Sequence, residues 1–191
     1  MNTPTPFSSS NATARPPVWA VVMGVAGCGK STLAQRISTR LQLSFIEGDD
    51  FHPTSNVQKM RQGTPLTDDD RQDWLNTLVH QLQACPQGAV LSCSALKRSY
   101  RERLRAALPQ LRFIYLEISE VEAGERVRAR AANHIFPTSL VASQFASLQA
   151  PLDEDLVLHL QASTAPDTLC QQACDWLLGA ALEHPTLRSP Q

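Results

Sequence analysis

Lysine is almost absent from this chain of 191 residues. Only Lys30, Lys59 and Lys97 occur, so 14 of the 17 basic residues are arginine. The 17 basic residues are balanced by 18 acidic ones, and the net charge is −1. A chain without excess positive charge does not hold nucleic acid or anionic lipid by bulk charge, so we expect neither as a partner. Each lysine in a chain with so few of them is a candidate for a specific functional role.

Paired cysteines and long apolar runs are absent as well. The five cysteines are an odd number and form no Cys-x-x-Cys pair, which argues against a disulfide framework or a zinc site. Cys170 and Cys174 stand four residues apart in an apolar helical pattern and are interpreted as small core residues. The longest apolar run, Val18 to Ala26, is far too short to cross a membrane. We therefore expect reduced thiols in a cytoplasmic protein without a membrane partner.

The length and the polar ends predict one domain between two tails. Residues 1–17 contain four prolines, many Ser and Thr and a single charge, and are predicted to form a disordered tail. They lack the basic and apolar regions of a secretory signal. Residues 181–191 contain Pro185 and Pro190 and are predicted to form a C-terminal tail. The domain is expected to span residues 18–180.

Short apolar segments alternate with longer segments of helical periodicity from residue 18 onward. This pattern predicts an α/β fold, with a five-stranded, mostly parallel sheet covered by helices on both faces. The expected strands are Trp19–Met23, Ser44–Ile46, Ala89–Cys93, Arg112–Glu117 and Leu156–Leu160. The expected helices are Lys30–Leu41, Asp68–Ala84, Arg98–Ala107, Glu120–Ala131, Ser139–Leu148 and Thr168–Leu178. Thr67 supplies a capping oxygen for the second of these helices, in which apolar residues form one stripe (Trp74, Leu75, Leu78, Val79 and Leu82).

A glycine-rich loop follows the first expected strand and opens the first expected helix. It matches the phosphate loop Gly-x-x-x-x-Gly-Lys-Ser/Thr and reads Gly24-Val25-Ala26-Gly27-Cys28-Gly29-Lys30-Ser31-Thr32. Glycines let the backbone curl so that its N–H groups face a phosphate, and the helix N-terminus adds positive potential. Lys30 is expected to reach the β- and γ-phosphates, and the Ser31 hydroxyl to join a Mg²⁺ shell. The sequence therefore predicts binding of a nucleoside triphosphate with Mg²⁺.

The loop alone does not separate a switch, a motor and a kinase. A GTPase needs an Asn-Lys-x-Asp base-reading motif, and no Asn-Lys pair occurs in the chain. A large ATPase usually carries an apolar strand that ends in Asp, whereas the third expected strand continues into Ser92-Cys93-Ser94. Glu117 could supply such a carboxylate or could be a solvated side chain. The better acidic candidates follow the second strand, in Glu47-Gly48-Asp49-Asp50.

Three sequence blocks carry a resemblance to a known family. They are Gly48-Asp49-x-x-His52-Pro53, Pro65-Leu66-x-Asp68-x-Asp70-Arg71-x-x-Trp74-Leu75 and Cys93-Ser94-Ala95-Leu96-Lys97. With these blocks, the chain resembles the gluconate kinases over residues 18–178. These are small P-loop sugar-acid kinases related in fold to shikimate and adenylate kinases.

The resemblance implies phosphoryl transfer from ATP, with Mg²⁺, to the 6-hydroxyl of D-gluconate, giving 6-phosphogluconate and ADP. It also implies a small lid and a homodimer. Two alternatives stay open. One is a related kinase that acts on another sugar acid or on a shikimate-like acceptor, and the other is a nucleotide-binding module without catalysis.

The acceptor site implied by the resemblance centres on Asp49. This residue is expected to orient the hydroxyl and accept its proton, and it is also a candidate Mg²⁺ ligand beside Ser31. His52 is the candidate for a substrate hydroxyl. A planar guanidinium or an ammonium suits the substrate carboxylate and the nearby phosphate, for which the candidates are Arg71, Lys97 and Arg101. Glu47 stands where relatives often carry Asp, so its part in the Mg²⁺ shell is left open.

Residues 126–137 resemble the mobile lid of this fold. The resemblance implies that Arg126 packs against adenine and that Arg130 reaches the phosphates. Closure of such a lid brings in a cation and excludes the water that would hydrolyse ATP. Lys59 lies between the Asp49 loop and Arg71, and it is interpreted either as a helix-surface residue or as a substrate contact.

Overall fold

The structure is a computed structural model that describes residues 16–130 and 139–182. Its centre is a five-stranded parallel sheet with the strand order β2-β3-β1-β4-β5. The strands are β1 (Val18–Met23), β2 (Ser44–Glu47), β3 (Gly88–Ser92), β4 (Arg112–Glu117) and β5 (Val157–Gln161). β1 and β3 are neighbours in the sheet, and the connections that follow them run in opposite directions. The connection after β1 leads to β2 at one edge, and the connection after β3 leads to β4 on the far side of β1. The carboxyl ends of β1 and β3 therefore flank the switch point where open α/β sheets bind ligands.

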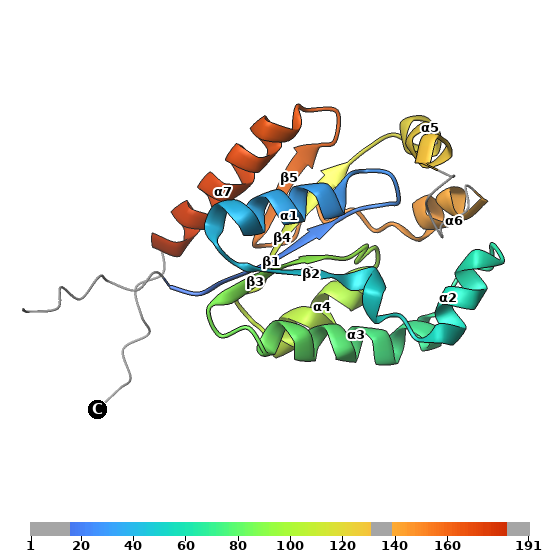
Figure 1. Cartoon of the computed structure of the whole chain (residues 1–191), viewed down its shortest axis with the longest axis horizontal. Coiled ribbons are helices and arrows are strands. Elements are labelled where there is room, and N and C mark those ends of the chain that lie inside the picture. The colour runs from blue at the N-terminus through green and yellow to red at the C-terminus, as the bar shows by residue number, and fades with distance from the viewer. Residues whose placement is uncertain (1–15, 131–138, 183–191) are drawn as a thin grey trace, which may run out of the picture.

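Helices cover both faces of the sheet (Figure 1). One face carries α1 (Lys30–Leu41) and α7 (Pro166–Leu182), and the other carries α3 (Asp68–Gln83) and α4 (Arg98–Ala107). The sequence of β1 explains this arrangement, because successive side chains of a strand point to opposite faces. Val18, Ala20 and Val22 belong to the core under α1 and α7, whereas Trp19, Val21 and Met23 belong to the core under α3 and α4.

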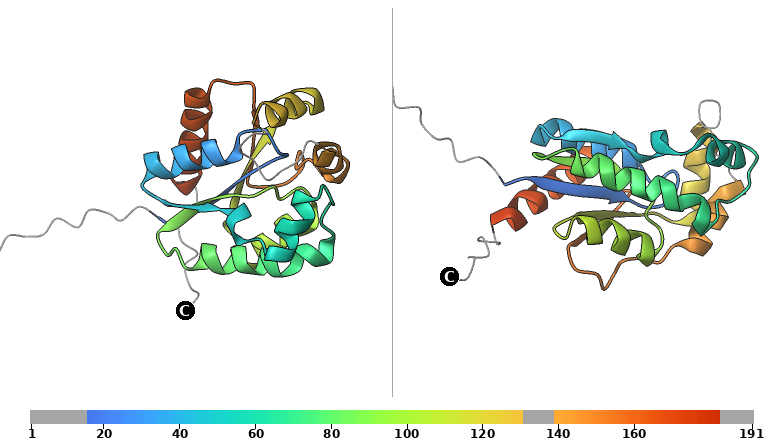
Figure 2. Two further views of the ribbon diagram at one scale, coloured as in Figure 1. Left: turned by 45° about the vertical axis from the view of Figure 1, so that its right-hand side comes forward. Right: turned by 90° about the horizontal axis from the view of Figure 1, so that it is seen from below.

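Three further helices gather at the carboxyl end of the sheet. They are α2 (Thr54–Arg61), α5 (Glu120–Arg130) and α6 (Ser139–Ser147). The three views of the ribbon agree on this position (Figures 1 and 2). They frame the end of the sheet at which the phosphate loop leaves β1.

Most expected elements are confirmed, and three of them (α1, β4 and α4) begin and end at the expected residues. The other strands differ from the expected bounds by one residue, at one end in β1 and β2 and at both ends in β3 and β5. Two short elements were not expected, namely α2 and the 3₁₀ turn η1 (Gly48–Phe51). Helix α7 continues to Leu182, two residues beyond the expected end of the domain at residue 180. Gly179 lowers helix propensity without ending the helix.

The N-terminus of α3 is capped as expected. The Thr67 hydroxyl accepts from the Asp70 N–H at 3.2 Å, and the Asp70 carboxylate accepts from the Thr67 N–H at 2.9 Å, which completes a capping box. In the predicted apolar stripe of α3, Val79 is partly buried and the other four residues are buried (Trp74, Leu75, Leu78 and Leu82). Cys170 and Cys174 lie in the core, as predicted. Among the described helices, none is both long enough and apolar enough to span a bilayer.

Candidate active site

The phosphate loop connects β1 to α1 at the switch point of the sheet. Gly29 has a φ of 100°, and a Cβ at this position would meet nothing within 4 Å, so the backbone conformation alone calls for glycine. Gly24 has a φ of 141°, and its Cβ would lie 2.7 Å from the Leu116 carbonyl oxygen at the end of β4. Within α1, the Leu33 N–H donates to the Gly29 carbonyl at 3.0 Å. The amides before it have no acceptor inside the helix and are suited to an anion.

Lys30 and Ser31 occupy the first turn of α1. The Lys30 ammonium donates to the carbonyl of Val25, in its own loop, at 3.0 Å. The Ser31 hydroxyl lies 3.3 Å from the hydroxyl of Ser92, at the end of β3. Both residues line the cavity described below. The loop therefore presents an ammonium and a hydroxyl on the same wall of the cavity.

Cys28 supports the loop from inside. Its side chain is buried in the core under α1, and burial raises the pKa of its thiol. The Cys28 N–H lies 3.4 Å from the Val25 carbonyl, to which it donates across a tight turn. The thiol is therefore protonated at neutral pH, and the residue contributes to the loop through packing and backbone geometry.

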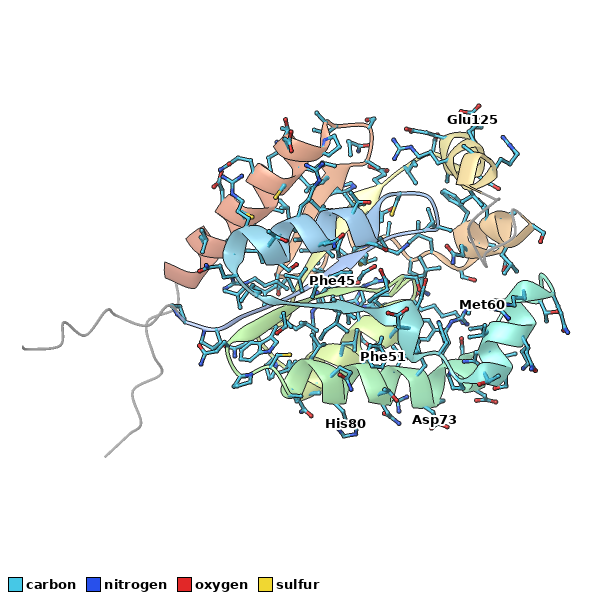
Figure 3. All side chains as sticks on the ribbon, in the orientation of Figure 1. Phe45, Phe51, Met60, Asp73, His80 and Glu125 are labelled. Atoms are coloured by element: carbon cyan, nitrogen blue, oxygen red, sulfur yellow. The ribbon has the colours of Figure 1, made fainter. Side chains whose placement is uncertain are left out.

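A cavity of about 240 Å³ extends from the phosphate loop to the predicted acceptor site. It is lined by residues of the loop and of α1, by residues around η1, and by residues of α3 and α6. Met60, labelled in Figure 3, belongs to its α2 wall. The polar and aromatic lining residues are Lys30, Ser31, Thr32, Asp49, His52, Arg71, Trp74, Ser94, Ser143, Gln144 and Ser147. One space thus joins the residues predicted for the nucleotide to Asp49, His52 and Arg71.

Asp49 lies on η1, and its position is set by the backbone around it. A Cβ at Gly48 would lie 2.5 Å from the Ser92 carbonyl oxygen, so glycine allows η1 to approach β3. The Trp74 indole N–H donates to the Gly48 carbonyl at 2.7 Å. Phe51 closes the turn and packs against the core under α3 and α4 (Figure 3). The Asp49 side chain remains 76% exposed in the cavity, where a substrate hydroxyl can reach it.

His52 lies beside Asp49 as a neutral ring. It stacks on Trp74 with 4.3 Å between ring centroids, and burial and the charge of Arg71 lower its pKa to about 4. The side-chain nitrogen of Asn56 donates to the Asp70 carbonyl at 2.7 Å and lies 3.4 Å from His52 Nδ1. Because that nitrogen is a donor, Nδ1 accepts and the proton of the ring sits on Nε2. His52 Nε2 lies 3.9 Å from the Asp49 carboxylate.

Arg71 reaches the cavity from α3. Its Nη1 donates to the Leu66 carbonyl at 2.6 Å, to the Thr67 carbonyl at 3.1 Å and to the Tyr100 hydroxyl at 3.4 Å. These contacts all use one nitrogen of the guanidinium. Within the described chain, no acceptor bonds its Nε or Nη2, and these two nitrogens form the edge that binds a carboxylate in a bidentate way. Of the cations predicted for the substrate, Arg71 is the one on the cavity wall.

The expected substrate contact of Arg101 is a wrong prediction. Its side chain is 1% exposed, and all five of its N–H donors have protein acceptors. Nη1 donates to the carbonyls of Ala95 and Leu96, at 2.9 and 3.1 Å. Nη2 donates to the Gln149 carbonyl at 2.9 Å and to the Glu154 carboxylate, which also accepts from Nε at 3.0 Å. Arg101 therefore holds together the loops after β3 and before β5.

Lys97 and Lys59 bind carboxylates of the protein and do not belong to the described lining of the cavity. Lys97 donates to both oxygens of Asp68, at 2.6 and 2.8 Å, which argues against its predicted substrate contact. Lys59 donates to Asp70 at 2.6 Å, and this hydrogen bond is the main cause that lowers the pKa of Asp70 to about 2. Because Asp70 also caps α3, Lys59 connects α2 to α3.

Arg126 lies on α5, where its Nη2 donates to Glu122 at 2.6 Å and to the Ala162 carbonyl at 3.1 Å. Its neighbour Val127 lines the cavity. The predicted adenine contact of Arg126 stays a prediction. The side chain of Arg130 and lid residues 131–138 lie outside the described residues.

Sequence reasoning gave no role to the cavity-facing residues of α6. Leu140, Ser143, Gln144 and Ser147 all line the cavity. Their spacing of three, four and seven residues places them on one face of a helix, and this spacing with three polar residues was the signal available in the sequence. Gln144 also touches the phosphate loop, because its side-chain oxygen accepts from the Ala26 N–H at 2.6 Å.

Comparisons with known proteins agree with this geometry. A family model described as "AAA domain" matches residues 20–154. The gluconokinase of Gluconobacter oxydans (strain 621H) is 44% identical over 160 residues, which cover 82% of this chain and 89% of that protein. The thermoresistant gluconokinase of Escherichia coli (strain K12) is 42% identical over 142 residues, which cover 72% and 81%. A crystal structure of a gluconokinase from Sinorhizobium meliloti 1021 matches with a TM-score of 0.80 at 40% identity, covering 88% of this chain and 95% of that one.

Proposed function

The chain belongs to the gluconokinase family, and we propose on this basis that it transfers the γ-phosphoryl group of ATP to the 6-hydroxyl of D-gluconate. The products are 6-phospho-D-gluconate and ADP. One observation carries the proposal: a single cavity is lined both by Lys30 and Ser31 of the phosphate loop and by the exposed carboxylate of Asp49. Phosphoryl transfer depends on holding the acceptor hydroxyl in line with the γ-phosphate, and a shared cavity allows it.

The acceptor hydroxyl is activated by Asp49. Its exposed carboxylate accepts the proton as the hydroxyl oxygen attacks the γ-phosphorus and the bond to the bridging oxygen of ADP breaks. The neutral His52 supports this step, because its Nε2–H lies 3.9 Å from the Asp49 carboxylate and can donate to a substrate oxygen that enters between them. At the other end of the substrate, Nε and Nη2 of Arg71 bind the carboxylate as a planar pair.

The nucleotide is bound by the loop Gly24–Thr32. Its amides and the Lys30 ammonium neutralise the β- and γ-phosphates. Lys30 leaves the Val25 carbonyl for the phosphates, since a charged acceptor gives the stronger hydrogen bond. Arg126 packing against adenine and Arg130 reaching the phosphates on lid closure belong to the same proposal, and they rest on the resemblance of residues 126–137 to a lid.

Mg²⁺ is the cofactor that accompanies ATP in this proposal. The Ser31 hydroxyl and the Asp49 carboxylate line one cavity and are hard oxygen donors of the kind that Mg²⁺ prefers. Among the described residues, no group of three or more His, Cys, Asp or Glu side chains could hold a metal ion by itself, which fits an ion held mainly by phosphates and water. When bound, Mg²⁺ supplies charge neutralisation at the transferring phosphoryl group. A homodimer and a cytoplasmic location are further proposals from the family resemblance.

A coupled assay of ADP release tests the proposed function. The purified chain is given ATP and Mg²⁺ with D-gluconate, other aldonic acids or shikimate in separate reactions. We expect gluconate-dependent ADP release with the highest kcat/KM in the series. Faster release with another acid would favour the related-kinase alternative, and the absence of acceptor-dependent release would favour a module without catalysis.

A further inference from the structure

Helix α6 contributes a polar wall to the cavity, and the proposed phosphoryl transfer assigns no role to its residues. Its cavity face is formed by Leu140, Ser143, Gln144 and Ser147. Of these residues, Gln144 has a fixed partner on the opposite element. Its Oε1 accepts from the backbone N–H of Ala26, the third residue of the phosphate loop, at 2.6 Å.

This contact determines which way the amide of Gln144 faces. A backbone N–H can only donate, so the atom that faces Ala26 must be the carbonyl oxygen of the side chain. The NH₂ group is then the other branch of the same planar amide. In the described part of the chain no protein acceptor bonds Gln144 Nε2, although Gln144 lines the cavity together with Asp49 and Arg71. A partly buried amide with its oxygen fixed therefore offers two N–H donors to a ligand.

The chemistry of the two substrates decides which of them suits these donors. Phosphates carry full charges, and the loop meets them with backbone amides and the Lys30 ammonium. A sugar acid is a chain of hydroxyl groups, and donors held in fixed positions select among its neutral oxygens. A site built to hydrogen-bond a hydroxyl also rejects analogues that lack it. An amide anchored through its oxygen is a donor of this kind.

We propose that Gln144 is a binding residue for the acceptor, with Nε2 donating to an oxygen of the sugar-acid chain while the Ala26 N–H holds the amide in place. This inference rests on the proposed function, because it assigns one contact within the same site. It makes the phosphate loop a part of the acceptor site as well, since the loop positions Gln144 through Ala26.

The variant Gln144→Glu separates this role from a purely structural one. The glutamate retains an oxygen that accepts from the Ala26 N–H, but it replaces the donor with a second acceptor that is negatively charged. We expect the KM for gluconate to rise at least about tenfold, and the melting temperature to stay near that of the wild type. Gln144→Ala removes both contacts and should also raise the KM for gluconate.

Gln149→Glu is the matched control. The Gln149 side-chain oxygen also accepts from a backbone N–H, that of Arg98 at 2.7 Å, but Gln149 is not part of the described cavity lining. This control should leave both KM values within about twofold of the wild type. The inference is overturned if Gln144→Glu keeps the wild-type KM for gluconate, or if the increase is confined to the KM for ATP. Either result with an active wild type leaves the proposed function intact, whereas an inactive wild type contradicts that function itself.

Discussion

The carboxylate of Asp49 and the ring of His52 form the reactive corner of the cavity. His52 is held from two sides, by stacking on Trp74 and by the hydrogen bond from Asn56. Its proton is thereby placed on Nε2, the atom nearest Asp49. Asp49 itself is exposed, so its position depends on the η1 backbone rather than on burial.

Asp49→Asn tests the proposed base. An amide cannot accept the hydroxyl proton as a carboxylate does, so we expect kcat to fall by at least about 10² while ATP binding persists. Steady-state kinetics and nucleotide titration measure the two effects. Asp50→Asn is the control, because Asp50 is exposed on the same turn and is absent from the described cavity lining; it should retain most activity. Near-normal turnover of Asp49→Asn would assign the base to another group.

Lys30→Ala tests the phosphate loop. Loss of the ammonium removes the charge that stabilises the β- and γ-phosphates, so turnover and nucleotide affinity should fall together. Arg36→Ala on the same helix is the control, since the Arg36–Asp167 pair is exposed and contributes little. Unaltered nucleotide binding and an unaltered rate in Lys30→Ala would be incompatible with the assigned role.

At the scale of secondary-structure elements, Arg101 connects three segments of the chain. It extends from α4 to the turn after β3, where Ala95 has a φ of 44°, a conformation that is uncommon for alanine. It also binds the Gln149 carbonyl and the Glu154 carboxylate. The turn carries Ser94 and Leu96 to the cavity. Arg101 therefore shapes the active site from the core without touching the ligands.

Arg101→Met measures this contribution. The substitution leaves the buried Glu154 carboxylate and several carbonyls without their donor, so we expect the free energy of unfolding to fall by about 3 kcal/mol. Arg103→Ala on the same helix is the control, because Arg103 bonds the exposed side chains of Gln72 and Asn76; a change of about 0.5 kcal/mol or less is expected. Equal stability losses in the two variants, measured by denaturant unfolding, would contradict the structural role of Arg101.

Local sequence patterns were sufficient to predict some helices and strands and insufficient to predict others. The apolar period and the phosphate-loop signature define α1 to the residue, and the same kind of period defines α4 and β4. By contrast, α2 has only one buried residue, Asn56, and it is held by contacts with Asp70 that lie outside its own sequence. No apolar pattern could have predicted it.

The same limit of local sequence patterns explains why two of the three cations predicted for the substrate do not line the cavity. Arg71, Lys97 and Arg101 are equivalent as charges in the sequence, and only distant partners separate them. Arg101 is buried because Glu154 approaches it from 53 residues further along the chain. The phosphate loop and Asp49 were predictable because their chemistry is contained in short contiguous motifs.

At the scale of the whole molecule, the two substrates meet where the strand order reverses. The phosphate loop leaves β1, η1 lies against the end of β3, and α2 and α6 stand beyond the same end of the sheet (Figures 1 and 2). Two cores on opposite faces hold this end in place. The near-zero net charge thus accompanies a cavity in which Lys30 and Arg71 are available for anions.

Burial of the neutral His52 makes global stability depend on pH. Its pKa is lowered from 6.5 to about 4, so between these values the unfolded chain binds more protons than the folded one. The contribution is fully present above pH 6.5 and is lost as the pH falls toward 4. We expect a loss of order 2 kcal/mol across this range. His52→Gln should flatten the dependence of the unfolding free energy on pH.

His80→Gln is the control for this prediction, because His80 is exposed on α3. It should keep the slope of the wild type between pH 4 and 6.5. Asp70, with a pKa of about 2, loses its contribution only below about pH 4, outside this window. If His52→Gln and the wild type have the same slope, the neutral buried ring is not the cause.

The most direct test of the central proposal is to identify the product of the purified enzyme. Gluconate is incubated with ATP and Mg²⁺, and the position and amount of the new phosphate ester are determined by ³¹P and ¹³C NMR. The proposed function predicts one equivalent of ester on the terminal hydroxyl, at carbon 6, for each ADP formed. ADP release without a gluconate ester, or an ester at another carbon, would contradict the proposed transfer.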